Sequence, residues 1–281
     1  MTEILINELS LSGQFSSVDE FINGGALINF TALLKEIKNT DALLYKKYDF
    51  FESKITKNMS IHNLLIGAIS RQFDEIRKFK TGLACLFENP YWEDNQKHNV
   101  NFAYRYRGNS VSGQSLAEAC ERDKIVISFM HHDFPSGRLA VMKEETEILL
   151  DDLLKEEDYF ETARNRNIIS FEDYCIKKFT GGKLDFSTLN KKEGFSLITR
   201  EEEDLFFDGF RKFASLSWPE IGKDQGFDYK EYKDNKKRFK SYNRKIHKFR
   251  ISQKSRCFGY REGDVFHVLL FDLTHDLSDD G

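Results

Sequence analysis

The stretch that decides the fold is residues 247–272, which read HKFRISQKSRCFGYREGDVFHVLLFD. Alternating apolar and polar positions, rich in aromatic and β-branched residues, predict strands at 247–252, 255–261 and 264–272. Glu262-Gly263 between the last two strands predicts a tight hairpin turn, because glycine tolerates the positive φ that such turns require. We therefore expect the chain to end in a small sheet.

The residues upstream of this stretch predict a further strand and helices. Phe195–Ile198 is expected to be a strand, and Thr199 is expected to cap a helix from Arg200 to about Ser215, with Glu202 in the capping box. A basic and helical stretch is expected from Tyr229 to about Arg244. The resulting order is β-α-α-β-β-β. The polar, glycine-containing stretch 181–193 is the best linker candidate, and it divides the chain into domains 1–190 and 191–281.

The N-terminal domain is expected to mix helices and strands, so the fold class of the whole chain is α+β. Ser17 with Glu20 predicts a capped helix, which Gly24-Gly25 interrupts. The expected helices are 17–44, 60–86, 115–122 and 144–168, and the expected strands lie within 99–113 and at 124–129.

Charge is distributed unevenly along the chain. The net charge is −4, yet the segment 229–256 holds twelve Lys and Arg against two acidic residues and is therefore +10, which leaves −14 for the rest. Such a basic segment in an acidic protein predicts an electrostatic surface for an anionic partner. The residues expected to bind RNA are Lys236, Lys237, Arg238, Lys240, Arg244, Lys245, Lys248 and Arg250.

The final strands resemble those of the RelE-like toxin superfamily. Residues 250–275 show a basic strand, a hairpin of the type R-x-x-G-x-R-E-G, and an aliphatic strand ending in D-x-x-H. Residues 213–221, FASLSWPEI, also look like the end of a helix in some relatives. The resemblance covers about 194–281. It implies a cytoplasmic toxin or antiviral defence protein that binds and cleaves mRNA, with the ribosome and an antitoxin or defence protein as possible partners.

The chemistry implied by this resemblance needs no metal and no cofactor. A base takes the proton of the RNA 2′-OH, cations stabilise the phosphorane, and an acid protonates the leaving 5′-oxygen. The residues with suitable side chains are Arg256, Arg261, Lys254, Tyr260 and His267, with His247 as another proton carrier. Lys254, Arg256 and Tyr260 lie at even spacing along a strand and are expected to share a face.

Simpler interpretations stand beside this one. The basic segment is either a solvated face or a phosphate-binding surface without catalysis. A non-catalytic module that docks on RNA or on an acidic protein is therefore the alternative function, so enzymatic activity is a hypothesis. His267 fits the outer face of a strand, and Asp272 with His275 fits an Asx turn as well as a site.

Two groups of residues in the N-terminal domain are candidates for a binding site. His131-His132-Asp133 follows a strand and has metal-ligand residue types, but adjacent histidines on a strand point to opposite sides, so no metal site is expected. Tyr91, Trp92 and the run Tyr104-Arg105-Tyr106-Arg107 either stack on bases or form a packed β surface.

Several protein classes lack support in the sequence. The start of the chain does not have the pattern of a signal peptide, and no apolar run approaches the ~20 residues of a membrane span, so we expect a cytoplasmic protein without a membrane partner. Cys85, Cys120, Cys175 and Cys257 lie far apart and indicate neither a disulfide framework nor a zinc site. Phosphate-loop, dinucleotide-binding, metalloprotease and serine-hydrolase motifs do not occur.

Overall fold

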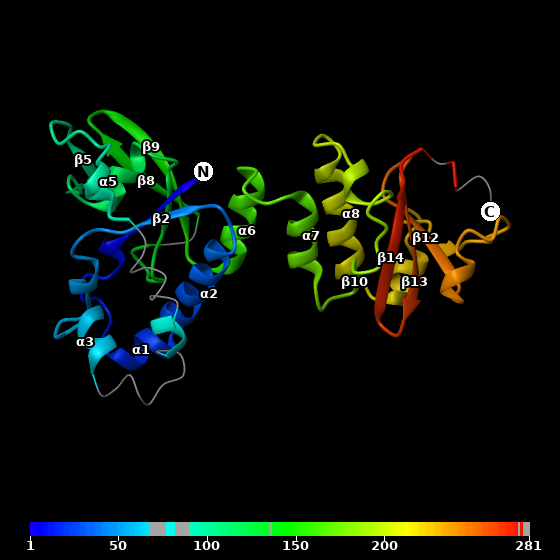
Figure 1. Cartoon of the computed structure of the whole chain (residues 1–281), viewed down its shortest axis with the longest axis horizontal. Helices are drawn as coiled ribbons and strands as arrows, with labels where there is room; N and C mark the ends of the chain where they lie inside the picture. Colours follow the sequence, from blue (N-terminus) through cyan, green and yellow to red (C-terminus); the bar gives the residue numbers. More distant parts are fainter. Residues whose placement is uncertain (68–76, 82–89, 135–136, 275, 278–281) are drawn as a thin grey trace. The chain divides into compact units, whose positions relative to one another are not determined.

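The computed structural model describes residues 1–67, 77–81, 90–134, 137–274 and 276–277 (Figure 1). The chain forms two compact units, Met1–Ile169 (unit 1) and Ser170–Gly281 (unit 2). Each unit contains helices and a sheet, so the expected α+β class is confirmed. The boundary lies at residue 170 rather than at the expected 191, because a helix and a strand before residue 191 pack into unit 2.

Unit 1 is built on a sheet whose described strands follow the order β2-β1-β7-β9-β8-β5-β6. β2, β1, β7 and β9 run parallel to one another, whereas β8, β5 and β6 pair antiparallel. The strands are β1 (Glu3–Ile6), β2 (Leu43–Tyr45), β5 (Tyr104–Tyr106), β6 (Asn109–Ser110), β7 (Ile125–Ile127), β8 (Gly137–Lys143) and β9 (Thr146–Leu153).

Helices cover both faces of this sheet. Ile4 and Ile6 pack with α1 (Val18–Asn23) and α2 (Ala26–Lys38), whereas Leu5 packs with α5 (Ser115–Cys120). The chain leaves β1 over one face to reach β2 and returns over the other face to reach β7. β1 and β7 therefore flank a topological switch point, and the carboxyl ends of strands at such a point are where open α/β sheets bind ligands.

The smaller elements of unit 1 surround this sheet. They are η1 (Glu8–Ser10), η2 (Phe50–Glu52), β3 (Lys54–Thr56), β4 (Met59–Ser60), α3 (Ile61–Ile66), η4 (Trp92–Asn95) and α6 (Glu156–Asn165). The expected cap of the first helix is confirmed, because the Ser17 hydroxyl accepts a hydrogen bond from the Glu20 N–H at 3.0 Å. Most of the helix expected at 60–86 lies outside the described residues.

Two expected helices of unit 1 are partly wrong. The helix expected at 17–44 ends at Lys38, and residues 43–45 form the edge strand β2. The helix expected at 144–168 contains strand β9 before α6. Residues 146–153 pair with strands on both sides, and this long-range pairing outweighs the local helical pattern of charges.

Unit 2 contains a sheet in the order β10-β14-β13-β12-β11 within the described residues. The three final strands are confirmed, with β12 and β13 antiparallel and β13 and β14 joined as a hairpin. The elements are α7 (Phe171–Phe179), β10 (Leu184–Asp185), η5 (Phe195–Leu197), α8 (Glu203–Ser215), α9 (Trp218–Lys223), β11 (Lys230–Glu231), η6 (Lys240–Tyr242), β12 (Ile246–Arg250), β13 (Arg256–Glu262) and β14 (Val265–Asp272).

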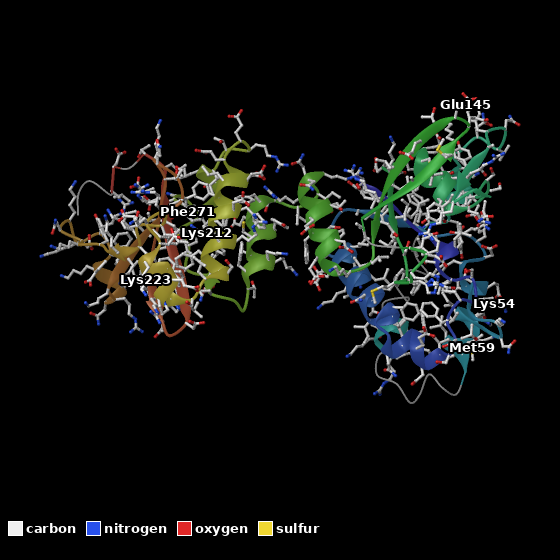
Figure 2. The ribbon with its side chains drawn as sticks, turned by 180° about the vertical axis from the view of Figure 1, so that it is seen from behind. Lys54, Met59, Glu145, Lys212, Lys223 and Phe271 are labelled. Atoms are coloured by element: carbon white, nitrogen blue, oxygen red, sulfur yellow. The ribbon has the colours of Figure 1, made fainter. Side chains whose placement is uncertain are left out.

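Phenylalanine rings join α8 to one face of this sheet. Phe206 and Phe210 lie 5.3 and 5.7 Å from the ring of Phe271 on β14, and Phe213 stacks on Phe249 at 4.3 Å. Figure 2 labels Phe271 on its strand. All five rings are buried. Burial of each ring contributes about 1.5–3 kcal/mol, so this aromatic layer fixes the sheet that positions the residues described below.

Two expectations for unit 2 are wrong. Phe195–Ile198 is not a strand, because 195–197 forms η5, and the edge strand of the sheet is instead β10. The basic stretch 229–244 is not a helix. Lys237 and Asn243 have φ values of 57° and 46°, which an α-helix cannot contain, and lysines one turn apart in a helix would repel one another.

Candidate functional site

A hydrogen-bonded acid and histidine lie at one edge of the unit 2 sheet. Asp185 of β10 and His267 of β14 are register partners, and the Nδ1 of His267 is 2.8 Å from an Asp185 carboxylate oxygen. Burial raises the pKa of Asp185, but hydrogen bonds from the backbone and hydroxyl of Ser187 and from His267 outweigh it and hold this pKa below its ordinary value. An ionised Asp185 only accepts, so His267 donates through Nδ1–H, and in the neutral form of the imidazole Nε2 is then the acceptor.

Two further side chains complete this group. The ring of Tyr260 on β13 stacks on the His267 ring, with centroids 4.8 Å apart and planes within 17°. Glu262 lies with a carboxylate oxygen 4.0 Å from Nε2 of His267. We call Asp185, Tyr260, Glu262 and His267 the histidine cluster.

The histidine cluster opens onto a groove. Asp185, Ser187, Val265 and His267 line a cavity of about 460 Å³ together with the C-terminal end of α7 and the residues that follow it. The His267 side chain is 20% exposed, so the imidazole is held by the protein and still reached by solvent. A substrate group in this groove would lie beside the imidazole of His267.

An exposed basic segment borders the cluster. Residues 233–245, which we call the basic loop, cross the same face of the sheet as Tyr260. The ring of Tyr242 in this loop lies 6.3 Å from the ring of Tyr260, and Arg244 pairs with Glu262 at 2.9 Å. The basic loop therefore places positive charge next to His267.

Most of the expected RNA-binding residues are exposed in the basic loop. These are Lys236, Lys237, Arg238, Lys240, Arg244 and Lys245. Some already contact acids: Arg238 pairs with Glu193, and Lys245 pairs with Glu231 at 3.0 Å. Such exposed pairs contribute little to stability, so a polyanion can displace the acidic partner at low cost.

Lys248 and Arg250 do not belong to this surface. Lys248 is buried, and its ammonium lies 5.4 Å from the centre of the Tyr232 ring. Burial, with Lys230 and Arg256 nearby, lowers the pKa of Lys248. Arg250 is 3.6 Å from Asp228. These two residues of β12 lie outside the basic loop, and their part in RNA binding stays a prediction.

Arg256 does not lie on the catalytic face that we expected it to share with Lys254 and Tyr260. Its side chain is buried, and Nη1 donates to the carbonyl oxygens of Ser252, Gln253 and Ser255 at 2.7, 3.3 and 3.0 Å. The guanidinium therefore closes the turn between β12 and β13. Lys254 is exposed in that turn, six residues from Tyr260 and roughly 20 Å along an extended chain. Neither cation joins the histidine cluster.

Arg261 and His247 lie on the other face of the sheet. Arg261 neighbours Tyr260 in β13, so its side chain projects oppositely, and it stacks on Trp218. His247 stacks on Tyr229 with ring planes 4° apart, and burial lowers its pKa. Burial raises the pKa of Tyr229 to about 12. Of the expected catalytic residues, the structure brings together Tyr260 and His267 only.

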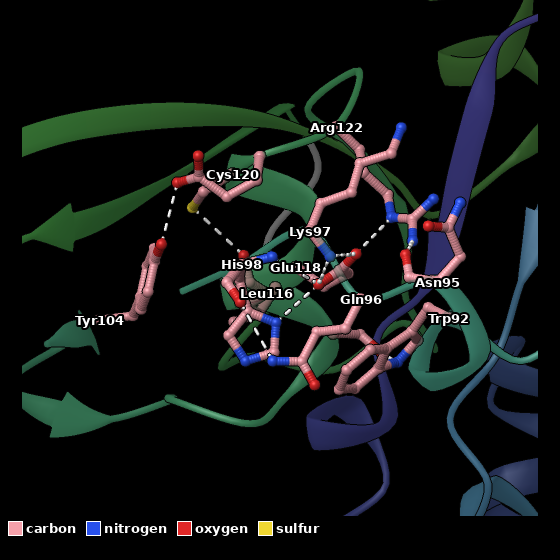
Figure 3. A network of polar contacts seen from close by, with 12 residues as sticks. Trp92, Asn95, Gln96, Lys97, His98, Tyr104, Leu116, Glu118, Cys120 and Arg122 are labelled. Atoms are coloured by element: carbon pink, nitrogen blue, oxygen red, sulfur yellow. Dashed lines mark hydrogen bonds and ion pairs between the residues drawn. The ribbon is translucent and has the colours of Figure 1, made fainter. Parts of the chain in front are cut away.

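Unit 1 contains a buried polar network rather than a base-stacking surface. Glu118 accepts hydrogen bonds from the backbone N–H of Lys97 and His98, from Nδ1 of His98 at 2.6 Å, and from Nε of Arg122 at 2.6 Å (Figure 3). Burial raises the pKa of Glu118, but the hydrogen bonds from these donors outweigh burial and hold this pKa below its ordinary value, so the carboxylate stays ionised. The network fixes the segment after η4 against α5.

The aromatic run of unit 1 is part of this packed core. Tyr104 and Tyr106 are buried and the Trp92 ring lies 5.4 Å from the ring of His98 (Figure 3). Arg105 is exposed, and Arg107 pairs with Asp133 at 3.0 Å. The packed β surface is therefore the interpretation that fits, and base stacking on these tyrosines is excluded by their burial.

Comparisons with known proteins identify no relative of this chain. No family model, no curated protein and no solved structure matches the chain. Among the described residues, none of the helices combines the length and the apolar character that a bilayer crossing requires.

Proposed function

We propose that unit 2 binds RNA through the basic loop and cleaves it at the histidine cluster, as a toxin-like or defence-associated endoribonuclease. The observation that supports this most directly is the Asp185–His267 pair. Both residues line the groove, and Glu262, 4.0 Å from Nε2 of His267, pairs with Arg244 of the basic loop. The resemblance of 194–281 to RelE-like toxins points to the same substrate, and it suggests mRNA on the ribosome.

The proposed reaction uses the 2′-OH of the RNA as the nucleophile. Nε2 of His267 takes the 2′-hydroxyl proton, and the resulting imidazolium is stabilised by the Asp185 carboxylate. The 2′-oxygen then forms a bond to phosphorus while the bond from phosphorus to the 5′-oxygen breaks. A proton donor, for which Tyr260 is the nearest candidate, protonates the departing 5′-oxygen. The products are a 2′,3′-cyclic phosphate and a free 5′-OH.

The basic loop supplies two parts of this mechanism. Lysine and arginine side chains neutralise the RNA backbone and give most of the salt-dependent affinity. Arg244, held near the cluster by Glu262, lies where an additional negative charge on phosphorus would develop. Exchange of Glu262 for a phosphate oxygen as the partner of Arg244 would couple binding to charge stabilisation.

The test compares the purified full chain with two histidine variants on an RNA oligonucleotide, with and without translating ribosomes. We expect His267→Ala to reduce cleavage by about 10²–10⁴-fold with RNA affinity unchanged within about twofold. His247→Ala is the matched control on the opposite face and should cleave like the wild type. Equal cleavage by His267→Ala and wild type would overturn the assignment.

A non-catalytic docking module is the second candidate. It is favoured by Arg256, because this arginine closes a turn instead of facing the groove. The same assay separates the two functions. RNA binding by the wild type without new 2′,3′-cyclic phosphate ends, in both the free and the ribosome-bound reaction, would support docking and exclude the cleavage proposal.

A further inference from the structure

Three side chains after β7 converge in unit 1. Nδ1 of His131 and Nε2 of His132 each lie 3.4 Å from the same Asp133 carboxylate oxygen. The three potential ligand atoms all lie within 4.8 Å of one another. The expectation that adjacent histidines point apart fails here, because residues 131–134 form a turn rather than an extended strand.

The turn is held rigidly by its surroundings. The N–H of Phe134 donates to the carbonyl oxygen of His131 at 3.0 Å, and the hydroxyl of Tyr106 donates to the carbonyl oxygen of Asp133 at 3.0 Å. The His131 ring packs edge-on against Phe15 with centroids 5.6 Å apart. The N–H of Asp133 donates a long hydrogen bond to Nδ1 of His131 at 3.4 Å, and a bound metal ion would replace this N–H as the partner of the nitrogen.

The two separations from Asp133 suit a tetrahedral transition-metal ion. Two ligands bonded to zinc at about 2.0–2.1 Å in a tetrahedron lie roughly 3.3–3.4 Å apart, and both distances to Asp133 have this value. Nitrogen donors favour zinc and related ions over calcium or magnesium, which prefer oxygen ligands. Three protein ligands leave the fourth position for a water or a substrate group.

The outer contacts of Asp133 fit the role of a metal ligand. Arg107 donates to the other carboxylate oxygen at 3.0 Å, which orients the carboxylate and leaves the oxygen between the histidines accessible. The side chains of His132 and Asp133 are 79% and 48% exposed, so an ion has direct access from solvent. The neighbouring charge of Arg107 will moderate the affinity, so we expect exchangeable rather than permanent binding.

The position of the turn in the fold points to a functional site. Residues 131–133 lie four to six residues beyond the carboxyl end of β7, which is one of the two strands that flank the switch point. Buried polar side chains gather at the same edge, where the Asn7 amide donates to the Ser128 hydroxyl at 2.8 Å. We propose that His131, His132 and Asp133 bind one divalent transition-metal ion of the zinc type, which makes unit 1 a metal-dependent sensor or catalyst.

The test is zinc binding by the full chain, measured by competition with a chromophoric chelator after prior removal of metals. The wild type should bind one zinc ion per chain, and His132→Ala should weaken this binding at least tenfold. His132 is largely exposed, so this change does not threaten folding, and Asp133→Asn provides a second variant that preserves shape. His62→Ala, an exposed histidine on α3, is the matched control and should bind like the wild type.

The outcomes are distinguishable from those of the RNA experiments. Wild-type zinc affinity in both His132→Ala and Asp133→Asn would overturn the site, and so would the absence of zinc binding by the wild type. Cleavage of RNA by unit 2 should continue in excess chelator, so loss of RNA cleavage in His267→Ala has no bearing on zinc. Conversely, His267→Ala should retain one zinc ion per chain.

Discussion

Arg261 holds its guanidinium carbon 4.0 Å from the centre of the Trp218 ring, on the face of the sheet opposite to His267. Its Nε also donates to the carbonyl oxygen of Gly263 at 2.8 Å in the hairpin turn. Arg256 is buried five residues earlier and closes the preceding turn. The two arginines that the sequence marks most clearly as catalytic therefore contact protein groups.

The different contacts of the two arginines predict unequal losses of stability on mutation. Arg256→Ala should lower the free energy of unfolding of unit 2 by about 2–4 kcal/mol, because three carbonyl groups lose a charged donor. Arg261→Ala removes an exposed cation–π contact and should cost about 0.5–1 kcal/mol. Urea denaturation followed by circular dichroism measures both. Equal losses for the two variants would contradict the assigned roles.

The salt dependence of RNA binding should reflect the exposed part of the basic segment only. If four to six side chains of the basic loop meet phosphates, the slope of log K against log salt on single strands should be about −3 to −4, at ~0.7 per contact. Filter binding over a salt series measures this slope. Lys237→Ala and Lys240→Ala should each reduce the slope by about 0.7, whereas Lys254→Ala, in the distant turn, should leave it unchanged.

Two of the four residues of the histidine cluster are predicted from the sequence as site residues. Tyr260 and His267 are predicted from residues of the right type on neighbouring strands, and the hairpin that pairs them follows from Glu262-Gly263. Asp185 is not predicted, because β10 is two residues long and lies 82 residues before its partner. Such a short edge strand has no periodicity of its own and is fixed by pairing with β14 alone.

In the basic segment, the sequence predicts more exposed basic residues than the structure has. Its charge predicts a single continuous basic surface. The sequence alone does not show that Lys245 is exposed and Lys248 is buried. Strand β12 places Lys248 on the inward face, where its ammonium lies 5.4 Å from the centre of the Tyr232 ring and 5.9 Å from that of Phe258. Which of two neighbouring lysines reaches solvent is decided by strand register, and register depends on partners that are remote in the sequence.

The position of Asp185 predicts which fragment of the chain is active. Residues 170–281 contain α7, β10 and the complete histidine cluster, whereas 191–281 lacks the first two elements together with Asp185. We expect 170–281 to fold alone and to cleave RNA, and 191–281 to be unstable and inactive. Thermal melts and the RNA end assay on the two fragments check this. Full activity of 191–281 would exclude Asp185 from the mechanism.

The same fragment tests whether unit 1 masks the basic loop. Unit 2 holds 22 Lys and Arg against 20 Asp and Glu, a net charge of +2, which leaves −6 for unit 1 out of the total of −4. The acidic residues that oppose the basic loop thus lie partly in unit 2 itself. Electrostatic cover by unit 1 should therefore be weak, and 170–281 should bind RNA no more than about threefold more tightly than the full chain at physiological salt. A gain of a hundredfold would indicate autoinhibition.

Asp152 makes the stability of unit 1 depend on pH. This residue is 1% exposed within β9, and burial raises the pKa of its carboxyl to about 7, with Asp158 adding to the shift and Ser128 opposing it. The raised pKa means that the folded state keeps a proton which the unfolded chain, with an ordinary pKa of ~4, has lost. Stability from this group is therefore complete below pH ~4, falls as the pH rises, and is lost above pH ~7.

Asp152→Asn should remove that dependence, because asparagine is neutral at every pH and has nearly the same shape. Relative to wild type, we expect the variant to gain about 1–3 kcal/mol between pH 5 and pH 8. Trp92 is the tryptophan of unit 1, so its fluorescence in a Trp218→Phe background reports urea unfolding of this unit alone. Glu147→Gln, an exposed site on the same strand, is the matched control. If the difference in unfolding free energy between Asp152→Asn and wild type is the same at pH 5 and pH 8, Asp152 is not a buried acid that titrates near neutrality.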